Sequence, residues 1–457
     1  MSLEQLKNKG PGNGRASSLV VGVVAVLVVA TVVLGWFLFE REKPQVVIEG
    51  DVGHLGAERE LTIMANDGKS GLRSIAVAVR QNNRQTPLLE RSFPRQGLLF
   101  GAGPARAEES LLLSGRDAGL VEGPAELLVT VRDFSWWNWL GGNLTEVSFS
   151  MVVDTRPPVV NIVESPAYIR AGGAGVVVYT LNEPAVRHGV MVAGAFHPGH
   201  PLPAKGPGTH VAFLGLPYNT ESLGAVHVLA MDLAGNEGRS SFAMHLQARR
   251  ILRDQISVSD GFLAAKLPEF AVHYPDLTGS PIEQYLRINN EIRQANNGRI
   301  QEICATSGPE RLWDGRFGRM ARSSPRAGFA DHRSYLYDGK IIDEQIHLGI
   351  DLASVRHAEI EAANRGMVVF AGYLGIYGNM VILDHGQGLF SLYSHLSTID
   401  AAVGDRMDRG AVLGRSGISG MAGGDHLHFS MLVNGIFVDP VEWWDENWLQ
   451  LNISGSL

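Results

Sequence analysis

The sequence contains a single cysteine, Cys304, among 457 residues. One thiol excludes an intramolecular disulfide framework and any zinc site built from several cysteines. The sequence also has no excess of positive charge, because it contains 39 lysines and arginines and 47 acidic residues, which give a net charge of −8. Without a basic excess, nucleic acid is not an expected partner. The 19% of charged residues beside 45% hydrophobic residues excludes a mostly disordered chain.

The length and the histidine content indicate the number of domains and the kind of chemistry to expect. A chain of 457 residues is too long for one typical domain, and we expect about three. Fifteen histidines make a metal-dependent enzyme worth testing. The sequence has no His-Glu-x-x-His segment, so a zinc site with its glutamate base on one helix is not the expected arrangement.

Residues 19–39 carry no charged side chain. A run of this length matches the roughly 20 apolar residues with which a helix crosses a bilayer. Lys7, Lys9 and Arg15 precede the run, whereas the charges that follow it balance one another. The excess of positive charge predicts that residues 1–18 form a cytoplasmic tail and that residues 44–457 lie outside the cytoplasm. We expect a single-pass protein of an inner (cytoplasmic) membrane.

A cleaved signal peptide is the alternative interpretation of the same run. Its apolar core is longer than the roughly 7–15 residues of a signal peptide, and no small-x-small cleavage site follows. The uncleaved anchor is therefore favoured.

The exported part is expected to be mainly β. Short alternating strands separated by Gly, Pro and Asn predict two β-sandwich modules, at residues 45–154 and 155–250. Both loosely resemble bacterial immunoglobulin-like modules, on the DTRPPVV junction and the AMDLAGNEG turn. Ser280 and Glu283 form a predicted capping box, with proline at the first helical position, within a mostly helical connector at residues 251–324. Strand patterns return in residues 325–448.

The candidate metal-binding and catalytic residues occur in this last segment. Residues 346–352, IHLGIDL, are predicted to form one strand with the side chains of His347, Gly349 and Asp351 on one face. Residues 426–431, HLHFSM, are predicted to form another, with His426 and His428 on one face. An Asn-Gly pair at 434–435 predicts a hairpin after it.

A third segment, residues 392–396, is predicted to place Tyr393 and His395 on a common face. Imidazole and carboxylate groups suit zinc, and an extra imidazole beside the metal suits proton transfer. Three protein ligands with one open position make a catalytic zinc site rather than a structural one.

The motifs of the segment, taken together, closely resemble the lysostaphin-type (LytM-like) zinc metallopeptidases of bacterial cell walls. The resemblance runs over about residues 325–440, and its motifs are FADHRSYLYDGK, HLGIDLA, ANRGMVVFAG, YGNMVILDHGQGLFSLYSHLS, VGDRMDRGAVLGRSGISG and GGDHLHFSMLVNGIFVDP. Two stretches depart from the family pattern. Ala330 stands where the family usually has glycine, and residues 354–364 replace its Gly-x-Pro-Val.

The resemblance implies an antiparallel β-sheet peptidase domain with one zinc ion per chain. It implies that zinc is bound by His347, Asp351 and His428. It further implies His395 and His426 as the residues that activate water and steady the oxyanion; which of the two is the base stays open. All five positions are filled.

The implied activity is a membrane-anchored zinc endopeptidase that hydrolyses stem or cross-link peptides of peptidoglycan. Two alternatives stay open. One is a non-enzymatic activator or an autoinhibited protein, in which the connector covers the cleft; a chain starting near Ser324 would then be the faster enzyme. The other is a zinc protease of secreted proteins.

The other histidines and a group of tryptophans have simpler explanations than a catalytic role. His385 is expected to be structural, His357 solvated, and the pair His197 and His200 part of a loop that binds nothing. Three tryptophans lie close together, at positions 136, 137 and 139. They are expected to fill a sandwich edge or an inter-domain contact; the alternative is an exposed aromatic loop that stacks on glycans or meets the membrane interface.

Overall fold

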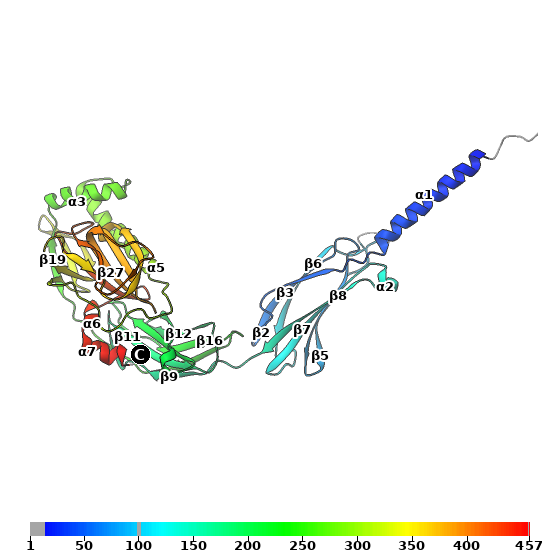
Figure 1. Ribbon diagram of the computed structural model, residues 1–457, viewed down its shortest axis with the longest axis horizontal. Coiled ribbons are helices and arrows are strands. Elements are labelled where there is room, and N and C mark those ends of the chain that lie inside the picture. Colours follow the sequence, from blue (N-terminus) through cyan, green and yellow to red (C-terminus); the bar gives the residue numbers. More distant parts are fainter. Residues whose placement is uncertain (1–13, 98–101, 456) are drawn as a thin grey trace, which may run out of the picture. The chain divides into compact units, whose positions relative to one another are not determined.

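The computed structural model describes residues 14–97, 102–455 and 457 (Figure 1). The proposed cytoplasmic tail therefore lies largely outside the described residues. The chain is mainly β and divides into two compact units, residues 1–156 with 233–236, and residues 157–232 with 237–457. The second predicted sandwich thus belongs to the same unit as the connector and the C-terminal domain.

The first unit begins with the apolar helix α1, Gly14–Leu38. Among the described residues, the stretch Ser18–Trp36 is the one helical segment long and apolar enough to cross a membrane, a property that signal sequences share. The strands that follow are β1 Gln45–Glu49, β2 His54–Leu55, β3 Glu58–Asn66, β4 Leu72–Gln81, β5 Arg84–Ser92, β6 Arg106–Ser114, β7 Gly123–Asp133 and β8 Leu144–Val153. The short turn α2, Trp137–Leu140, lies between β7 and β8.

Two sheets make up the first unit, in the orders β1-β3-β6 and β2-β8-β7-β4-β5. Alternate residues point inward, as in β7 where Leu127, Val129 and Val131 are buried. These side chains share one hydrophobic cluster with Leu61 and Leu113 of the other sheet. The period-2 pattern therefore forms a sandwich. Its likeness to immunoglobulin modules stays a prediction.

The second unit opens with a pair of four-stranded sheets, β14-β15-β11-β9 and β13-β12-β16-β17. Their strands are β9 Val160–Glu164, β11 Ala174–Leu181, β12 Arg187–Val192, β13 Ala195–Pro198, β14 His200–Pro201, β15 Thr209–Gly215, β16 His227–Met231 and β17 Glu237–Ser241. A separate two-stranded sheet contains β10 Tyr168–Arg170 and β18 His245–Gln247. Unlike β7, strand β11 is buried on both faces. Val177 and Tyr179 face the partner sheet, whereas Val176 and Val178 join the core of the C-terminal domain.

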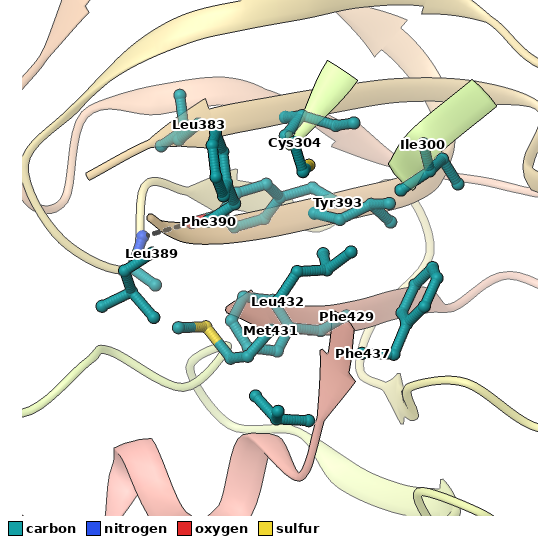
Figure 2. Packing of buried hydrophobic residues seen from close by; sticks show 14 of the residues in the cluster. Ile300, Cys304, Leu383, Leu389, Phe390, Tyr393, Phe429, Met431, Leu432 and Phe437 are labelled. Carbon is teal, nitrogen blue, oxygen red and sulfur yellow. Dashed lines mark hydrogen bonds between the residues drawn. The ribbon is translucent and has the colours of Figure 1, made fainter. Parts of the chain in front are cut away.

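The connector contains one strand and three helices: β19 Arg253–Ser257, α3 Asp260–His273, α4 Pro281–Arg287 and α5 Arg293–Ile303, with the turn η2 Ile288–Ile292 before α5. The capping box of Ser280 and Glu283 is present as predicted. Strand β19 pairs in parallel with β21. Figure 2 shows Ile300 and Cys304, from α5 and its C-cap, packed with Phe390 of the large sheet. The connector is therefore part of the hydrophobic core of this unit.

The C-terminal domain is a ten-stranded sheet in which β20-β23-β30-β27-β26-β25-β28 are consecutive neighbours and β24, β29 and β31 pair off this path. Strands β21 and β22 form a separate sheet with β19. The elements are β20 Ser324–Ala327, β21 His332–Tyr337, β22 Lys340–Ile346, β23 Ile350–Ala353, β24 Glu359–Glu361, β25 Gly366–Tyr373, β26 Asn379–Asp384, β27 Leu389–Ile399, β28 Arg406–Met407, β29 Val412–Ser416, β30 Leu427–Val433, β31 Ile436–Val438, α6 Pro440–Trp444 and α7 Glu446–Leu449.

The predicted hairpin between β30 and β31 is confirmed. Val433 pairs with Ile436, and Asn434 and Gly435 both have positive φ angles, as a tight two-residue turn requires. The hairpin also touches the second sandwich, because Asn434 Nδ2 donates to the carbonyl of Phe213 at 3.0 Å. A side chain at Gly215 would come within 3.0 Å of Val433, so this glycine permits the close approach.

Candidate metal centre

The segment that carries His347 is not the single strand predicted from the sequence. Strand β22 ends at Ile346, β23 begins at Ile350, and the three residues between them belong to neither strand, with a bend at Gly349. The backbone of His347 instead pairs with the loop before β21, with its amide 3.0 Å from the carbonyl of Asp331. His347 and Asp351 still converge, because the chain bends between them.

Gly349 is needed at this bend for space. A Cβ atom built there would lie 2.5 Å from Nε2 of His428 and 2.6 Å from Oγ of Ser430. No ordinary side chain fits at those distances. The glycine therefore lets the ring of His428 enter between the two strands.

His428 stands directly opposite Asp351, because the two residues are register partners of antiparallel strands β30 and β23. Three ligand-type atoms consequently form a nearly equilateral triangle. Nε2 of His347 lies 3.0 Å from Oδ1 of Asp351 and 2.9 Å from Nδ1 of His428, which is in turn 3.0 Å from that same oxygen. All three side chains are buried, and the group is one that could hold a metal ion.

The outer hydrogen bonds fix which ring nitrogens carry protons. Nδ1 of His347 lies 2.8 Å from the carbonyl of Gly328, so this nitrogen donates and Nε2 keeps its lone pair. Ser430 Oγ donates to the carbonyl of Leu348 at 2.8 Å and therefore accepts from Nε2 of His428 at 3.1 Å. Nδ1 of His428 then also keeps its lone pair.

Two imidazole lone pairs and a carboxylate oxygen thus face one another without a proton between them. Three lone pairs at these distances repel one another unless a cation lies between them. The three atoms are close enough together for one zinc ion, with Zn–N distances of about 2.0–2.1 Å, to contact each of them. A second ring nitrogen that donates to a carbonyl or hydroxyl is also the usual support of a metal-binding histidine. The donor set therefore fits zinc.

His395 lies beside the three ligand-type atoms because of a bulge in β27 that the sequence did not predict. Asn379 pairs with Leu396 and Val381 with Tyr393, so β27 contains one extra residue between these pairs. His395 adopts a left-handed φ of 62° at this bulge. Its ring lies 5.8 Å from that of His428, whereas the ring of Tyr393 packs 5.3 Å from that of Phe429. The predicted common face of Tyr393 and His395 is therefore wrong.

His426 lies one residue before β30, at the rim of the site. Its ring centroid is 4.8 Å from that of His395, and its Nε2 is 3.5 Å from Oδ1 of Asp351. Nδ1 of His426 bonds the carbonyl of Gly424 at 2.7 Å, and Nδ1 of His395 bonds that of Ser419 at 2.9 Å. Both residues consequently turn Nε2 toward the three ligand-type atoms.

The charges of the cluster are strongly coupled. Burial alone would raise the pKa of Asp351. When no metal is bound and protons occupy the histidines instead, the charge of His347 and the hydrogen bonds from the histidines outweigh burial and hold that pKa well below 3.8. Burial lowers the pKa of His428 to about 4 and, together with the neighbouring imidazoles, lowers that of His395 well below 6.5. His426 differs, because Asp351 outweighs its burial and raises its pKa.

Arg333 is a member of the site to which the sequence analysis gave no role. Its guanidinium bonds Oδ2 of Asp351 at 2.7 Å, and both side chains are largely buried. The other oxygen, Oδ1, is left to face the two histidines. Arg333 therefore orients the carboxylate and balances its charge.

A cavity of about 390 Å³ opens onto this cluster. One wall is contributed by the connector, with Phe262 and Tyr285 among its lining residues. Another part of the lining comes from the glycine-rich loop before His426, to which α3 is attached, since Oε1 of Glu269 accepts from the amide of Gly420 at 2.6 Å. The connector thus shapes the cleft and leaves the five clustered residues in contact with the cavity.

The other histidines lie apart from this cluster. His385 is fully buried between the carbonyl of Arg365 and Oγ of Ser391, where burial lowers its pKa to about 4. His357 is exposed near Ser397. His197 and His200 do not form the predicted loop, because they lie in the short strands β13 and β14.

Comparison with known proteins identifies this domain. Residues 345–440 match the profile of Peptidase family M23. The chain is 38% identical over 97 residues to the DD-carboxypeptidase/endopeptidase Mpg of Neisseria meningitidis serogroup B, covering 21% of this chain and 22% of that protein. It is 32% identical over 114 residues to the peptidoglycan DD-endopeptidase ShyC of Vibrio cholerae, covering 25% of this chain and 26% of that protein. The chain thus aligns with about a quarter of the length of these curated relatives.

A crystal structure described as a peptidase M23 from Pseudomonas aeruginosa is also similar. It shares 21% sequence identity with a TM-score of 0.40, and the match covers 60% of this chain and 94% of that one. The match of residues 345–440 to the family profile, by itself, identifies the C-terminal segment as an M23 (LytM-type) peptidase domain and confirms the resemblance to lysostaphin-type peptidases read from the sequence.

Proposed function

We propose that this protein is a membrane-anchored zinc metalloendopeptidase that hydrolyses peptide bonds in the stem or cross-link peptides of peptidoglycan. The observation that carries the proposal is the triangle of His347, Asp351 and His428, in which three lone pairs face one another over 2.9–3.0 Å. The similarity to peptidoglycan endopeptidases over residues of the same domain supports the choice of substrate.

In this proposal His347, Asp351 and His428 bind one zinc ion. Bound zinc supplies Lewis acidity, which polarises a carbonyl group and makes water a better nucleophile at neutral pH. His395 and His426 hold Nε2 toward the same point, so that one can take the proton of the attacking water and the other can donate a hydrogen bond to the developing oxyanion. Their backbone contacts to Ser419 and Gly424 fix both rings before substrate arrives.

The cleft suits an extended peptide. The loop that forms one wall is rich in glycine, with Gly420, Gly423 and Gly424 before His426. Gly423 lines the cavity, and a Cβ atom there would meet nothing within 4 Å, so there is room for substrate backbone beside it. Phe262 and Tyr285 of the connector also line the cavity.

The cellular location follows from α1. We propose that α1 anchors the chain in the bacterial inner membrane with the N-terminus in the cytoplasm and the peptidase domain outside it. The apolar length of Ser18–Trp36 and the positive residues before it support this orientation. Residues 45–154 and 155–250 would then be sandwich modules between the membrane and the peptidase domain.

The test uses the full chain in detergent, loaded with zinc and incubated with purified peptidoglycan, and mass spectrometry identifies the products. We expect new peptide ends with wild type and none with His428→Ala. His357→Ala, which removes an exposed histidine outside the cluster, is the matched control and should cleave normally. Zinc-loaded wild type that leaves peptidoglycan intact would refute the proposal. Cleavage of unfolded secreted proteins but not of peptidoglycan would favour the general protease, and cleavage of neither would favour the activator.

A further inference from the structure

The first unit contains an exposed aromatic loop whose side chains the proposed catalysis does not use. In this loop, residues 136–140 between β7 and β8, Trp139 is 98% exposed and Leu140 is 61% exposed. Burying large apolar side chains is favourable, so the exposure of two adjacent ones on a folded domain marks a contact surface. The question is which partner covers them.

The backbone of the loop holds these side chains outward. Asn138, Trp139 and Leu140 have consecutive left-handed φ angles of 53°, 54° and 67°. Asparagine tolerates this conformation, but tryptophan and leucine adopt it at a steric cost. Strain of this kind persists where the surroundings enforce it, often at functional surfaces.

The surroundings here are the end of α1. The amide of Trp136 donates to the carbonyl of Leu38 at 2.8 Å, and the ring of Phe39 packs edge-on against that of Trp136 at 6.0 Å. Oγ of Ser135 donates to the carbonyl of Glu40 at 2.8 Å. Within the first unit, the loop is therefore attached to residues that lie two to four positions beyond the apolar span ending at Trp36.

A buried polar network makes this attachment firm. Asp133, fully buried, accepts from the amides of Ser135 and Asn143 at 3.0 and 2.7 Å. The Asn143 side chain donates in turn to the carbonyls of Glu40 and Glu42 at 3.2 and 3.1 Å. The two ends of the loop and the chain leaving α1 are thus held by the same few groups.

Cations border the aromatic side chains. The guanidinium of Arg41 lies 4.0 Å from the ring centroid of Trp137. Arg73, an exposed residue of β4, donates to the carbonyl of Leu140 at 3.3 Å. Tryptophan beside arginine is the combination that suits the boundary between acyl chains and phosphate headgroups.

We infer that loop 136–140 is a membrane-contact surface that lies in the headgroup region of the leaflet from which α1 emerges. The occupant is the phospholipid bilayer, because the loop is hydrogen-bonded to the chain within one helical turn of the apolar span. This inference rests on the anchoring role of α1 in the proposed function, and it is independent of the peptidase chemistry. It would fix the first sandwich against the membrane surface rather than let it swing on a free linker.

The test places a fluorophore on an introduced cysteine in the full chain, which is reconstituted into vesicles of phosphatidylethanolamine and phosphatidylglycerol. Trp139→Cys reports the loop. Val121→Cys is the matched control, because Val121 is also exposed, at 57%, but precedes the other end of β7. Eleven strand residues separate the two ends by about 35 Å. Cys304 is buried with 0% exposure and should not react.

Brominated lipids should quench the label at position 139 several-fold more than the label at position 121, and aqueous iodide should show the reverse. Equal quenching at the two positions, in a chain that resists carbonate extraction, would overturn the inference while leaving the anchor intact. Release of the chain by carbonate would refute the anchor and the inference together. Protection of position 139 by added peptidoglycan but not by lipid would also overturn the inference, in favour of a glycan surface. His428→Ala should leave the quenching unchanged, which separates this result from the peptidase proposal.

Discussion

The contact between Arg333 and Asp351 gives the most direct prediction about the metal centre. Arg333→Met removes the 2.7 Å bond to Oδ2 but keeps a long apolar side chain in the same space. Oδ1 of Asp351, which faces His347 and His428, then loses the partner that orients its carboxylate. We expect weaker zinc binding even though no proposed ligand is changed.

The magnitude follows from the burial of the pair. Loss of an outer-sphere partner typically costs 10–100-fold in metal affinity, or about 1.4–2.7 kcal/mol. The side chains of Arg333 and Asp351 are only 15% and 11% exposed, so water cannot replace the missing donor well. Without zinc, removing one partner of this buried ion pair should also destabilise the fold, by about 3–5 kcal/mol.

The assay is competition for zinc between the full-length chain and a coloured chelator, with thermal unfolding measured with and without the metal. Arg326→Met is the matched control, because Arg326 is an exposed arginine that lines the same cavity and is not bonded to Asp351. Arg333→Lys should restore part of the affinity through its charge. If folded Arg333→Met binds zinc as tightly as the Arg326→Met control, the orienting role of Arg333 is refuted.

The remaining predictions concern space, pH and the connector. Gly349→Ala should displace the ring of His428 and abolish zinc binding, as measured by the same competition. Unchanged zinc affinity would show that a methyl group fits between residue 349 and the ring of His428. Burial raises the pKa of Glu442 from 4.5 to about 8, so its contribution to stability is complete below pH 4.5 and is lost as the pH rises toward 8. Glu442→Gln should therefore stabilise the fold by up to about 4 kcal/mol at pH 8 and have little effect at pH 4, as thermal unfolding can measure; a shift independent of pH would contradict this assignment. Deletion of residues 251–323 should abolish folding rather than activate the enzyme, because Ile300 and its neighbours leave the core; a folded, faster enzyme by circular dichroism and peptidoglycan turnover would instead support autoinhibition.

Local patterns predicted well where the neighbouring residues decide the structure. The Asn-Gly turn at 434–435 and the capping box at Ser280 depend on a few adjacent residues, and both are present. The five proposed site residues also lie together, although their roles are still proposals. Alternation could not predict the bend at 347–349 or the bulge at His395, because both depend on which strand lies alongside.

Other parts of the site leave little or no trace in the sequence. The carbonyls of Gly328, Ser419 and Gly424 support three of the histidines, and a carbonyl belongs to every residue. Arg333 had a signal, since it lies in the FADHRSYLYDGK motif, but only the structure shows its bond to Asp351. The double burial of β11 is likewise visible only as an uninterrupted apolar run, which fits a buried helix or strand equally well.

The use of backbone carbonyls as supports has a consequence for mutational tolerance. A side-chain support is lost with one substitution, whereas a carbonyl survives any substitution that preserves the path of the loop. The orientation of His347, His395 and His426 is therefore insulated from point mutations at the positions that support them. His428 alone depends on a side chain, the hydroxyl of Ser430. In a saturation screen, position 430 should accept few residues. At position 419, substitutions should be limited only by the backbone path of the loop and by the contacts of the Ser419 side chain itself.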